Sequence, residues 1–127
     1  MITLNKEKLD GFFNDEENAI SDINEDMILD IIKDRDIDFE NAYYSLPCES
    51  CGGEKVEGER AYKFLEYHFY VYTKNNKYVT NSLAVEEKET SFIRLQREGV
   101  VDNSYIVSII VCAGCGAFTI EIEEFEI

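Results

Sequence analysis

Two Cys-x-x-Cys pairs contain all four cysteines of this 127-residue chain, and they constrain its fold more than any other feature. Cys48 and Cys51 form the first pair, Cys112 and Cys115 the second, and a glycine follows each second cysteine. Glycine there can adopt a left-handed backbone conformation, which turns the chain and frees amide groups to face sulfur. Two such knuckles supply the four thiolates of a tetrahedral Zn²⁺ site. One shared ion would join the middle of the chain to its C-terminal part.

Four cysteines fill the coordination sphere of such an ion and leave no position for water. We therefore expect one structural Zn²⁺ with no hydrolytic role. Iron is an alternative, because a tetrahedron of thiolates also suits it. A site shared between two chains, and redox or disulfide chemistry, are further alternatives. A thioredoxin-like motif would use one pair at the start of a helix, whereas both pairs here lie among predicted strands.

The charge of the chain is strongly negative, with 27 acidic and 12 basic residues and a net charge of −15. The density is highest in residues 1–47, which hold 13 acidic and 4 basic residues. This balance argues against direct binding to nucleic acid, where Lys and Arg neutralise phosphates. It favours a basic protein, or the basic cleft of an enzyme, as the partner. Solubility alone is an equally good explanation of the acidity.

The length favours a single domain over residues 1–127. The first residues of the sequence show no apolar signal region, and no apolar stretch is long enough to cross a membrane. These features predict a cytoplasmic protein with no membrane association. Thiols stay reduced in the cytoplasm, where paired cysteines favour a metal over a disulfide.

The N-terminal part, residues 1–38, is expected to be helical. Isoleucine and methionine recur at steps of three and four between residues 14 and 33, which predicts an amphipathic helix. A shorter helical piece is expected over residues 4–13. Acidic residues in and after the longer helix would face a partner and steer its association: Asp22, Glu25, Asp26, Asp30, Asp34, Asp36 and Asp38.

Residues 39–127 are expected to be β-rich. The aromatic segment at residues 61–72 favours a strand, although its spacing also fits a helix, and Asn75-Asn76 would form the following hairpin turn. Residues 91–97 and 105–111 predict an antiparallel pair. The second of these strands is apolar on both faces, so it should be central and covered on both sides. The expected fold class is α+β, an antiparallel sheet built around the two knuckles with N-terminal acidic helices packed on one face.

At the two knuckles the chain resembles the zinc-ribbon superfamily. The resembling motifs are Cys-Glu-Ser-Cys-Gly and Cys-Ala-Gly-Cys-Gly, each flanked by predicted strands. The resemblance implies zinc and the local ribbon fold at Cys48, Cys51, Cys112 and Cys115. The chain departs from the pattern in two ways. Sixty residues separate its knuckles, against about 15–20 in compact ribbons, and it is acidic.

Groups typical of a catalytic site are sparse. His68 is the only histidine, and Glu66 lies two residues away on the same side of the predicted strand. No serine lies in a Gly-x-Ser-x-Gly turn, and no Gly-rich phosphate loop is present. We expect His68 to be structural and the protein not to be an enzyme.

Two functions remain. The first is a non-enzymatic acidic zinc-binding protein that acts through a protein partner, such as an immunity protein, an inhibitor or a mimic of DNA charge. The alternative is an accessory zinc-ribbon module of transcription, translation or nucleic-acid processing, which rests on fold-level analogy. The alternative predicts that the basic residues of the β-rich part cluster on one face: Lys55, Arg60, Lys63, Lys74, Lys77, Lys88, Arg94 and Arg97.

Overall fold

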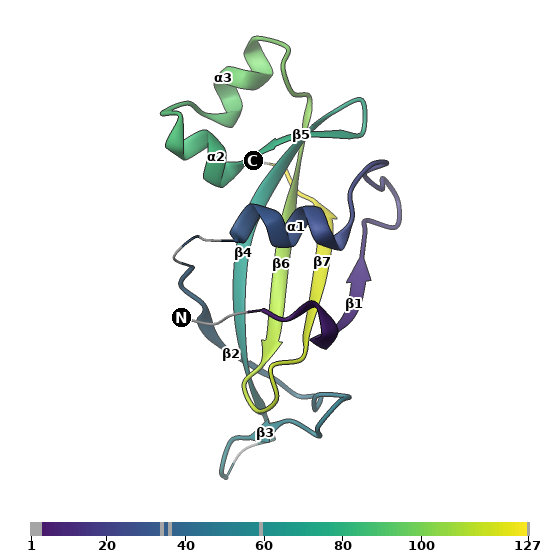
Figure 1. The fold of residues 1–127 in the computed structure, drawn as a ribbon, viewed down its shortest axis with the longest axis vertical. Helices are drawn as coiled ribbons and strands as arrows, with labels where there is room; N and C mark the ends of the chain where they lie inside the picture. Colours follow the sequence, from purple (N-terminus) through teal and green to yellow (C-terminus); the bar gives the residue numbers. More distant parts are fainter. Residues whose placement is uncertain (1–3, 34, 36, 59, 127) are drawn as a thin grey trace.

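The computed structural model describes residues 4–33, 35, 37–58 and 60–126, and they form a mixed β-sheet with short helices against it (Figure 1). The strand order is β1-β7-β6-β4-β2, and β3 and β5 also pair with β4. The strands are β1 (Leu9–Phe13), β2 (Glu40–Tyr44), β3 (Glu54–Lys55), β4 (Tyr62–Lys74), β5 (Lys77–Asn81), β6 (Asn103–Cys112) and β7 (Phe118–Glu124). The helices are the 3-10 helix η1 (Lys6–Lys8), α1 (Glu25–Ile32), α2 (Ser82–Glu87) and α3 (Phe92–Arg97). The general α+β prediction is confirmed.

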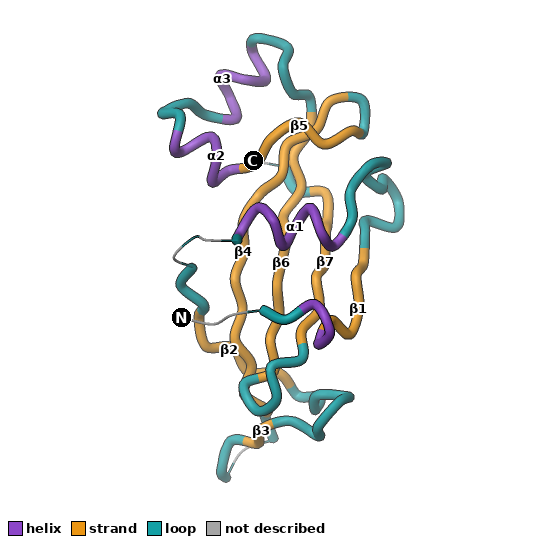
Figure 2. Tube along the Cα trace, in the orientation of Figure 1, coloured by secondary structure: helices purple, strands orange, loops and turns teal. Residues whose placement is uncertain are grey.

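The centre of the sheet is β6, as its sequence predicted. It lies between β4 and β7 (Figure 2). Its pairing with each of them is antiparallel and runs along its length. The side chains of Tyr105, Val107 and Ile109 on one face of β6 are fully buried. Residues 62–74 are one long strand, which settles the ambiguity over residues 61–72 in favour of a strand.

The expectation of a purely antiparallel sheet is wrong at one edge. There β1 pairs with β7 in parallel, and residues 4–13 form η1 and β1 where a helical piece was expected. The physical reason is that pairing with β7 satisfies the backbone of β1 and packs Leu9 and Phe12 against the main core. A lone helical turn over this segment would have no comparable burial.

The long N-terminal helix expected over residues 14–33 is also reduced to α1. Asn14 and Asp15 cap the local backbone instead: Asn14 Oδ1 accepts hydrogen bonds from the amides of Asp15 and Ile20 at 2.8 and 3.2 Å. Such side-chain bonds offer the backbone an alternative to the helix. The helix begins only after Asn24, whose Oδ1 accepts a hydrogen bond from the Met27 amide at 3.0 Å.

One face of the sheet carries the main core. In Figure 1, α1 crosses β4, β6 and β7 on this face, and Ile28 is fully buried in the same cluster as Val107 and Ile109. On the opposite face, Ile106 and Ile110 of β6 stay partly exposed. The prediction that β6 is covered on both sides therefore fails in the middle of the sheet.

A second, smaller core lies at the α2–α3 end. Residues 91–97, expected to be a strand, form α3 because the Ser91 hydroxyl accepts a hydrogen bond from the Arg94 amide and caps a helix. This places Phe92 against Tyr72, with ring centroids 4.9 Å apart. The hairpin turn at Asn75-Asn76 is confirmed, with φ of 53° and 63°. In the described residues, no helix has the length and apolar character needed to cross a membrane.

Candidate metal centre

The four cysteines meet at the end of the sheet opposite α2 and α3. Their sulfur atoms all lie within 4.8 Å of one another. Cys48 Sγ is 3.8 Å from Cys115 Sγ, and Cys51 Sγ is 3.6 Å from Cys112 Sγ. A tetrahedral ion with bonds of about 2.3 Å to sulfur would hold the sulfurs about 3.8 Å apart. A disulfide needs about 2.05 Å, so the arrangement fits a metal and not a bonded pair.

The strand β4 brings the two knuckles together. The first knuckle lies in the loop between β2 and β3, and both of these strands pair with the first residues of β4. Cys112 is the last residue of β6 and is paired with Phe64 of β4. The second knuckle is the turn from β6 into β7. The site therefore exists only when β4 has all of these neighbours.

The two knuckles use the same backbone turn. The amide of Gly52 donates to the carbonyl of Cys48 at 2.9 Å, and that of Gly116 donates to the carbonyl of Cys112 at 3.0 Å. The φ angles of the two glycines are 82° and 81°, in the region that L side chains rarely adopt. The expected role of glycine after each pair is confirmed.

Backbone amides also point at the sulfur atoms. Cys51 Sγ accepts from the amide of Gly53 at 3.3 Å, and Cys115 Sγ accepts from that of Ala117 at 3.5 Å. Hydrogen bonds of this kind stabilise a thiolate, and they orient it toward an ion. A side chain at Gly53 would not fit, because its Cβ would lie 2.9 Å from the Tyr62 ring.

The environment of the thiols favours a positive ion among them. Burial raises the pKa of Cys48, whereas the hydrogen bond from Ala117 lowers that of Cys115. At Cys51 the hydrogen bond from Gly53 lowers the pKa, but the neighbouring sulfurs together outweigh it and raise the pKa to about 12. Four thiolates so close would repel one another, and a divalent cation removes that repulsion.

The sequence matches, over residues 1–127, the family described as "Protein of unknown function (DUF3785)". The chain belongs to this family. No curated protein and no solved structure matches the chain.

Two N-terminal residues support the knuckles, and the sequence pattern did not indicate either. Lys8 Nζ donates a hydrogen bond to the carbonyl oxygen of Cys115 at 2.6 Å. The Ser50 hydroxyl lies 3.0 Å from both carboxylate oxygens of Asp10. Each knuckle is thus held by one residue from η1 or β1. No local signal could have shown this, since both contacts depend on the pairing of β1 with β7.

Two of the acidic residues expected to face a partner make contacts within the protein. Asp22 accepts a hydrogen bond from the Tyr78 amide at 2.8 Å, and Asp26 lies 2.7 Å from Lys6 Nζ in an ion pair. Both are therefore engaged within the protein. Glu25 is half-buried, and Asp30 and Asp38 are exposed. Asp34 and Asp36 lie outside the described residues.

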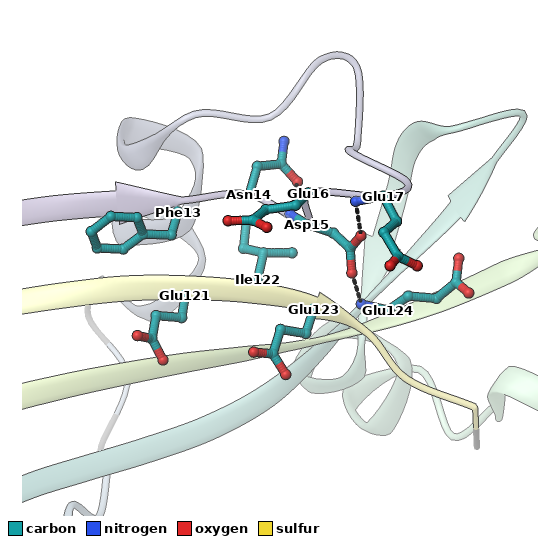
Figure 3. Close-up of a pocket in the computed structure, with 9 residues that line it drawn as sticks. All are labelled: Phe13, Asn14, Asp15, Glu16, Glu17, Glu121, Ile122, Glu123 and Glu124. Carbon is teal, nitrogen blue, oxygen red and sulfur yellow. Dashed lines mark hydrogen bonds between the residues drawn. The ribbon is translucent and has the colours of Figure 1, made fainter.

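A different acidic feature lies between the end of β1 and β7, and Figure 3 shows its lining. It is an open cleft of about 480 Å³. Asp15 is fixed there, because its carboxylate accepts from the amides of Glu124 and Glu17 at 2.8 and 2.9 Å, which lowers its pKa. Two acidic motifs in the sequence, Asp-Glu-Glu and Glu-x-Glu-Glu, were the available signal for this cleft. The lining consists of Phe13, Asn14, Asp15, Glu16, Glu17, Glu121, Ile122, Glu123 and Glu124.

His68 has a partner that sequence reasoning missed. Its Nδ1 lies 2.8 Å from Ser108 Oγ and its Nε2 lies 3.4 Å from Glu66 Oε1, and the Tyr44 hydroxyl also donates to Glu66. The residue types match a catalytic triad. However, Ser108 is in the middle of β6, where the described backbone is paired on both sides, so no amide is free to stabilise an oxyanion. The arrangement is better explained as cross-strand packing.

Proposed function

We propose that this protein is a non-enzymatic, acidic zinc-binding protein that acts through a basic protein partner. The observation that carries the proposal is the acidic cleft, whose described lining contains several carboxylates and no Lys or Arg. Its carboxylates belong to Asp15, Glu16, Glu17, Glu121, Glu123 and Glu124. Such a field attracts cationic side chains and repels phosphates. An immunity protein, an inhibitor or a mimic of DNA charge would use the field in this way, against a basic protein or the basic cleft of an enzyme.

The metal in this proposal is one structural Zn²⁺, held by Cys48, Cys51, Cys112 and Cys115. Support comes from the sulfur separations, the amide hydrogen bonds to sulfur and the pair of matching glycine turns. These are the features of a zinc-ribbon site with a large insert between its knuckles. The ion would hold the loops at one end of the sheet rather than perform chemistry. Iron in the same tetrahedron is the alternative, and metal analysis distinguishes iron from zinc.

The rival function, an accessory nucleic-acid module, is less well supported by the placement of the basic residues. Lys55 of β3 and Lys63 of β4 lie at the β3 end of the molecule, near the knuckles, and Arg60 lies between these two strands in the sequence. The other five lie toward the opposite end, on the β4–β5 hairpin, directly after α2 and on α3 (Figure 1). Arg94 is also paired with Glu98 at 3.2 Å. The arrangement does not give the single basic face that phosphate binding favours.

Affinity capture from host lysate tests the proposed function. The zinc-loaded protein is compared with a variant in which two cleft residues are reversed, Glu16→Lys with Glu123→Lys. The control is Asp30→Lys with Asp38→Lys, which makes the same charge change at exposed positions outside the cleft. We expect one basic protein to be captured, less at high salt and much less by the cleft variant. Capture of nucleic-acid machinery that nuclease treatment abolishes would instead favour the rival.

A further inference from the structure

Among the residues that the structure describes, no helix crosses the middle of the sheet face opposite α1. We refer to the residues on this side of the sheet as the open face. The strand register shows which of them are neighbours. One row runs across four strands, because His68 is paired with Ser108, Ser108 with Glu121, and Glu121 with Phe13. The rows on either side complete the surface. The open face consists of Phe13, Glu66, His68, Tyr70, Ile106, Ser108, Ile110, Thr119, Glu121 and Glu123.

Part of the open face is apolar where a solvated strand would be polar. Ile106 and Ile110 are only half-buried, although they flank Ser108 on the central strand. Phe13 is 55% exposed, and its ring lies over Gly11, where a Cβ would be 2.6 Å from a ring carbon. A sheet that faces water on one side normally alternates apolar and polar positions. Apolar residues on both faces of β6 indicate that the open face is covered by something else.

The charge of the open face limits what can cover it. Glu66, Glu121 and Glu123 surround the isoleucines, and the open face contains no Lys or Arg. The acidic cleft continues from it, since Phe13, Glu121 and Glu123 belong to both. In Figure 3 the side chains of Glu121 and Glu123 lie on the same side of β7. A second copy of this chain would bring two negative surfaces together, whereas a cationic partner would be attracted.

We propose that the open face docks a basic amphipathic segment of the partner protein, an inference that rests on the function proposed above. The aliphatic side of the segment would lie on Ile106 and Ile110. Its Lys and Arg side chains would reach Glu66, Glu121 and the acidic cleft. A short segment is enough, because α1, with eight residues, already crosses β4, β6 and β7 on the other face. The surface combines the apolar centre and charged rim that protein interfaces use.

The test uses a synthetic amphipathic helix of about 15 residues made of leucine and lysine, with a leucine–glutamate peptide as its control. Amide chemical shifts of the ¹⁵N-labelled, zinc-loaded protein map the contact. We expect the lysine peptide to shift amides of β4, β6 and β7 and the glutamate peptide to shift none. Changes confined to α1 or to the α2–α3 end would overturn the proposal.

Variants then separate the contributions. Ile110→Thr and Glu121→Lys should each weaken peptide binding about tenfold, while Asp30→Lys on α1 should change it less than about twofold. A thermal melt identifies any variant that fails to fold, and the other then stands alone as the test. Equal weakening by Asp30→Lys would show only a charge effect and would refute the docking site. A dimer of the unmodified protein that Ile110→Thr dissociates would also refute it, by making a second copy the occupant.

The captured partner distinguishes this inference from the proposed function. If a basic partner binds Ile110→Thr and Glu121→Lys as well as the unmodified protein, the docking site is wrong and the function stands. If the unmodified protein captures no basic partner, the function fails and the inference fails with it.

Discussion

Lys8 and Cys115 are joined by a hydrogen bond of 2.6 Å, from Nζ to the carbonyl oxygen, across 107 positions of sequence. The contact places a cation beside the cysteine cluster. The Lys8 side chain also lies close to Gly116, because a Cβ added at Gly116 would be 3.7 Å from the Cδ of Lys8. The N-terminal segment and the second knuckle are therefore in direct contact through η1.

Replacing Lys8 with Met should lower the melting temperature of the metal-loaded protein by about 2–4 °C, because a charged hydrogen bond at the site is lost. Hydrogen exchange should also accelerate in β1. The matched control is Lys6→Met in the same helical turn, where Lys6 pairs with Asp26 away from the site. Equal effects of the two substitutions would show that Lys8 has no special relation to the knuckle.

Metal analysis should find one zinc ion per chain, and Co²⁺ substitution should give the absorption of a four-thiolate tetrahedron. Cys115→Ser should weaken metal binding at least about 100-fold, since a direct ligand is removed, and it should destabilise β7. The control is Glu49→Gln, an exposed knuckle residue that is not a candidate ligand. Half an ion per chain would indicate a site shared between chains, and an unchanged melt after chelation would contradict a structural metal.

The Tyr44–Glu66 hydrogen bond should make stability depend on pH in a defined way. It lowers the pKa of Glu66 from its ordinary 4.5, so its stabilisation is present above that value and is lost as pH falls through the folded pKa. Burial, and then the bond itself, raise the pKa of Tyr44 from 10 to about 12. That stabilisation is present below pH 10 and is lost as pH rises toward 12.

Tyr44→Phe should therefore reduce the free energy of unfolding most between pH 4.5 and pH 10. The difference in this free energy from the unmodified protein should become smaller at lower and at higher pH. Urea unfolding across the pH range measures it. Tyr43→Phe is the control, because the neighbouring Tyr43 is 58% exposed and points to the other face. A difference curve that is flat with pH would mean that the hydrogen bond contributes nothing.

Asn24→Ala should destabilise the protein by about 1 kcal/mol, because the Met27 amide loses its cap. Asn24→Asp and Asn24→Ser should restore most of the loss, since both side chains accept the same hydrogen bond. The midpoint of urea unfolding reports the change. If the Asp and Ser variants were as unstable as the Ala variant, the cap would not be the cause.

The sequence was informative wherever a local pattern met a tertiary partner. The spacing of Cys48, Cys51, Cys112 and Cys115 predicted a cluster that the fold brings together. The apolar run of β6 predicted a central strand, because no edge position could bury so much of it. The turn at Asn75-Asn76 was readable from the left-handed preference of asparagine.

The incorrect predictions arose where another interaction competed with the structure that the periodic pattern favours. Asn14 and Asp15 satisfy local amides and prevent a helix that the isoleucine spacing favours. Ser91 starts α3 in a segment whose alternation resembled a strand. The parallel position of β1, and with it the contacts of Lys8 and Asp10, depends on a pairing with β7, which is distant in the sequence. The acidic cleft was missed for the same reason, since one wall is the end of β1 with the loop that follows it and the other is β7.

The neighbouring positions of β1 and β7 have a consequence for the order of events during synthesis. The strand β1 must wait until β7 has been synthesised before its backbone can pair there. Contacts of such large sequence separation slow folding, because a long loop must close before they form. The nascent chain therefore carries Leu9 and Phe12 without their β7 neighbour until the second knuckle has been made, and only then does the sheet acquire this edge.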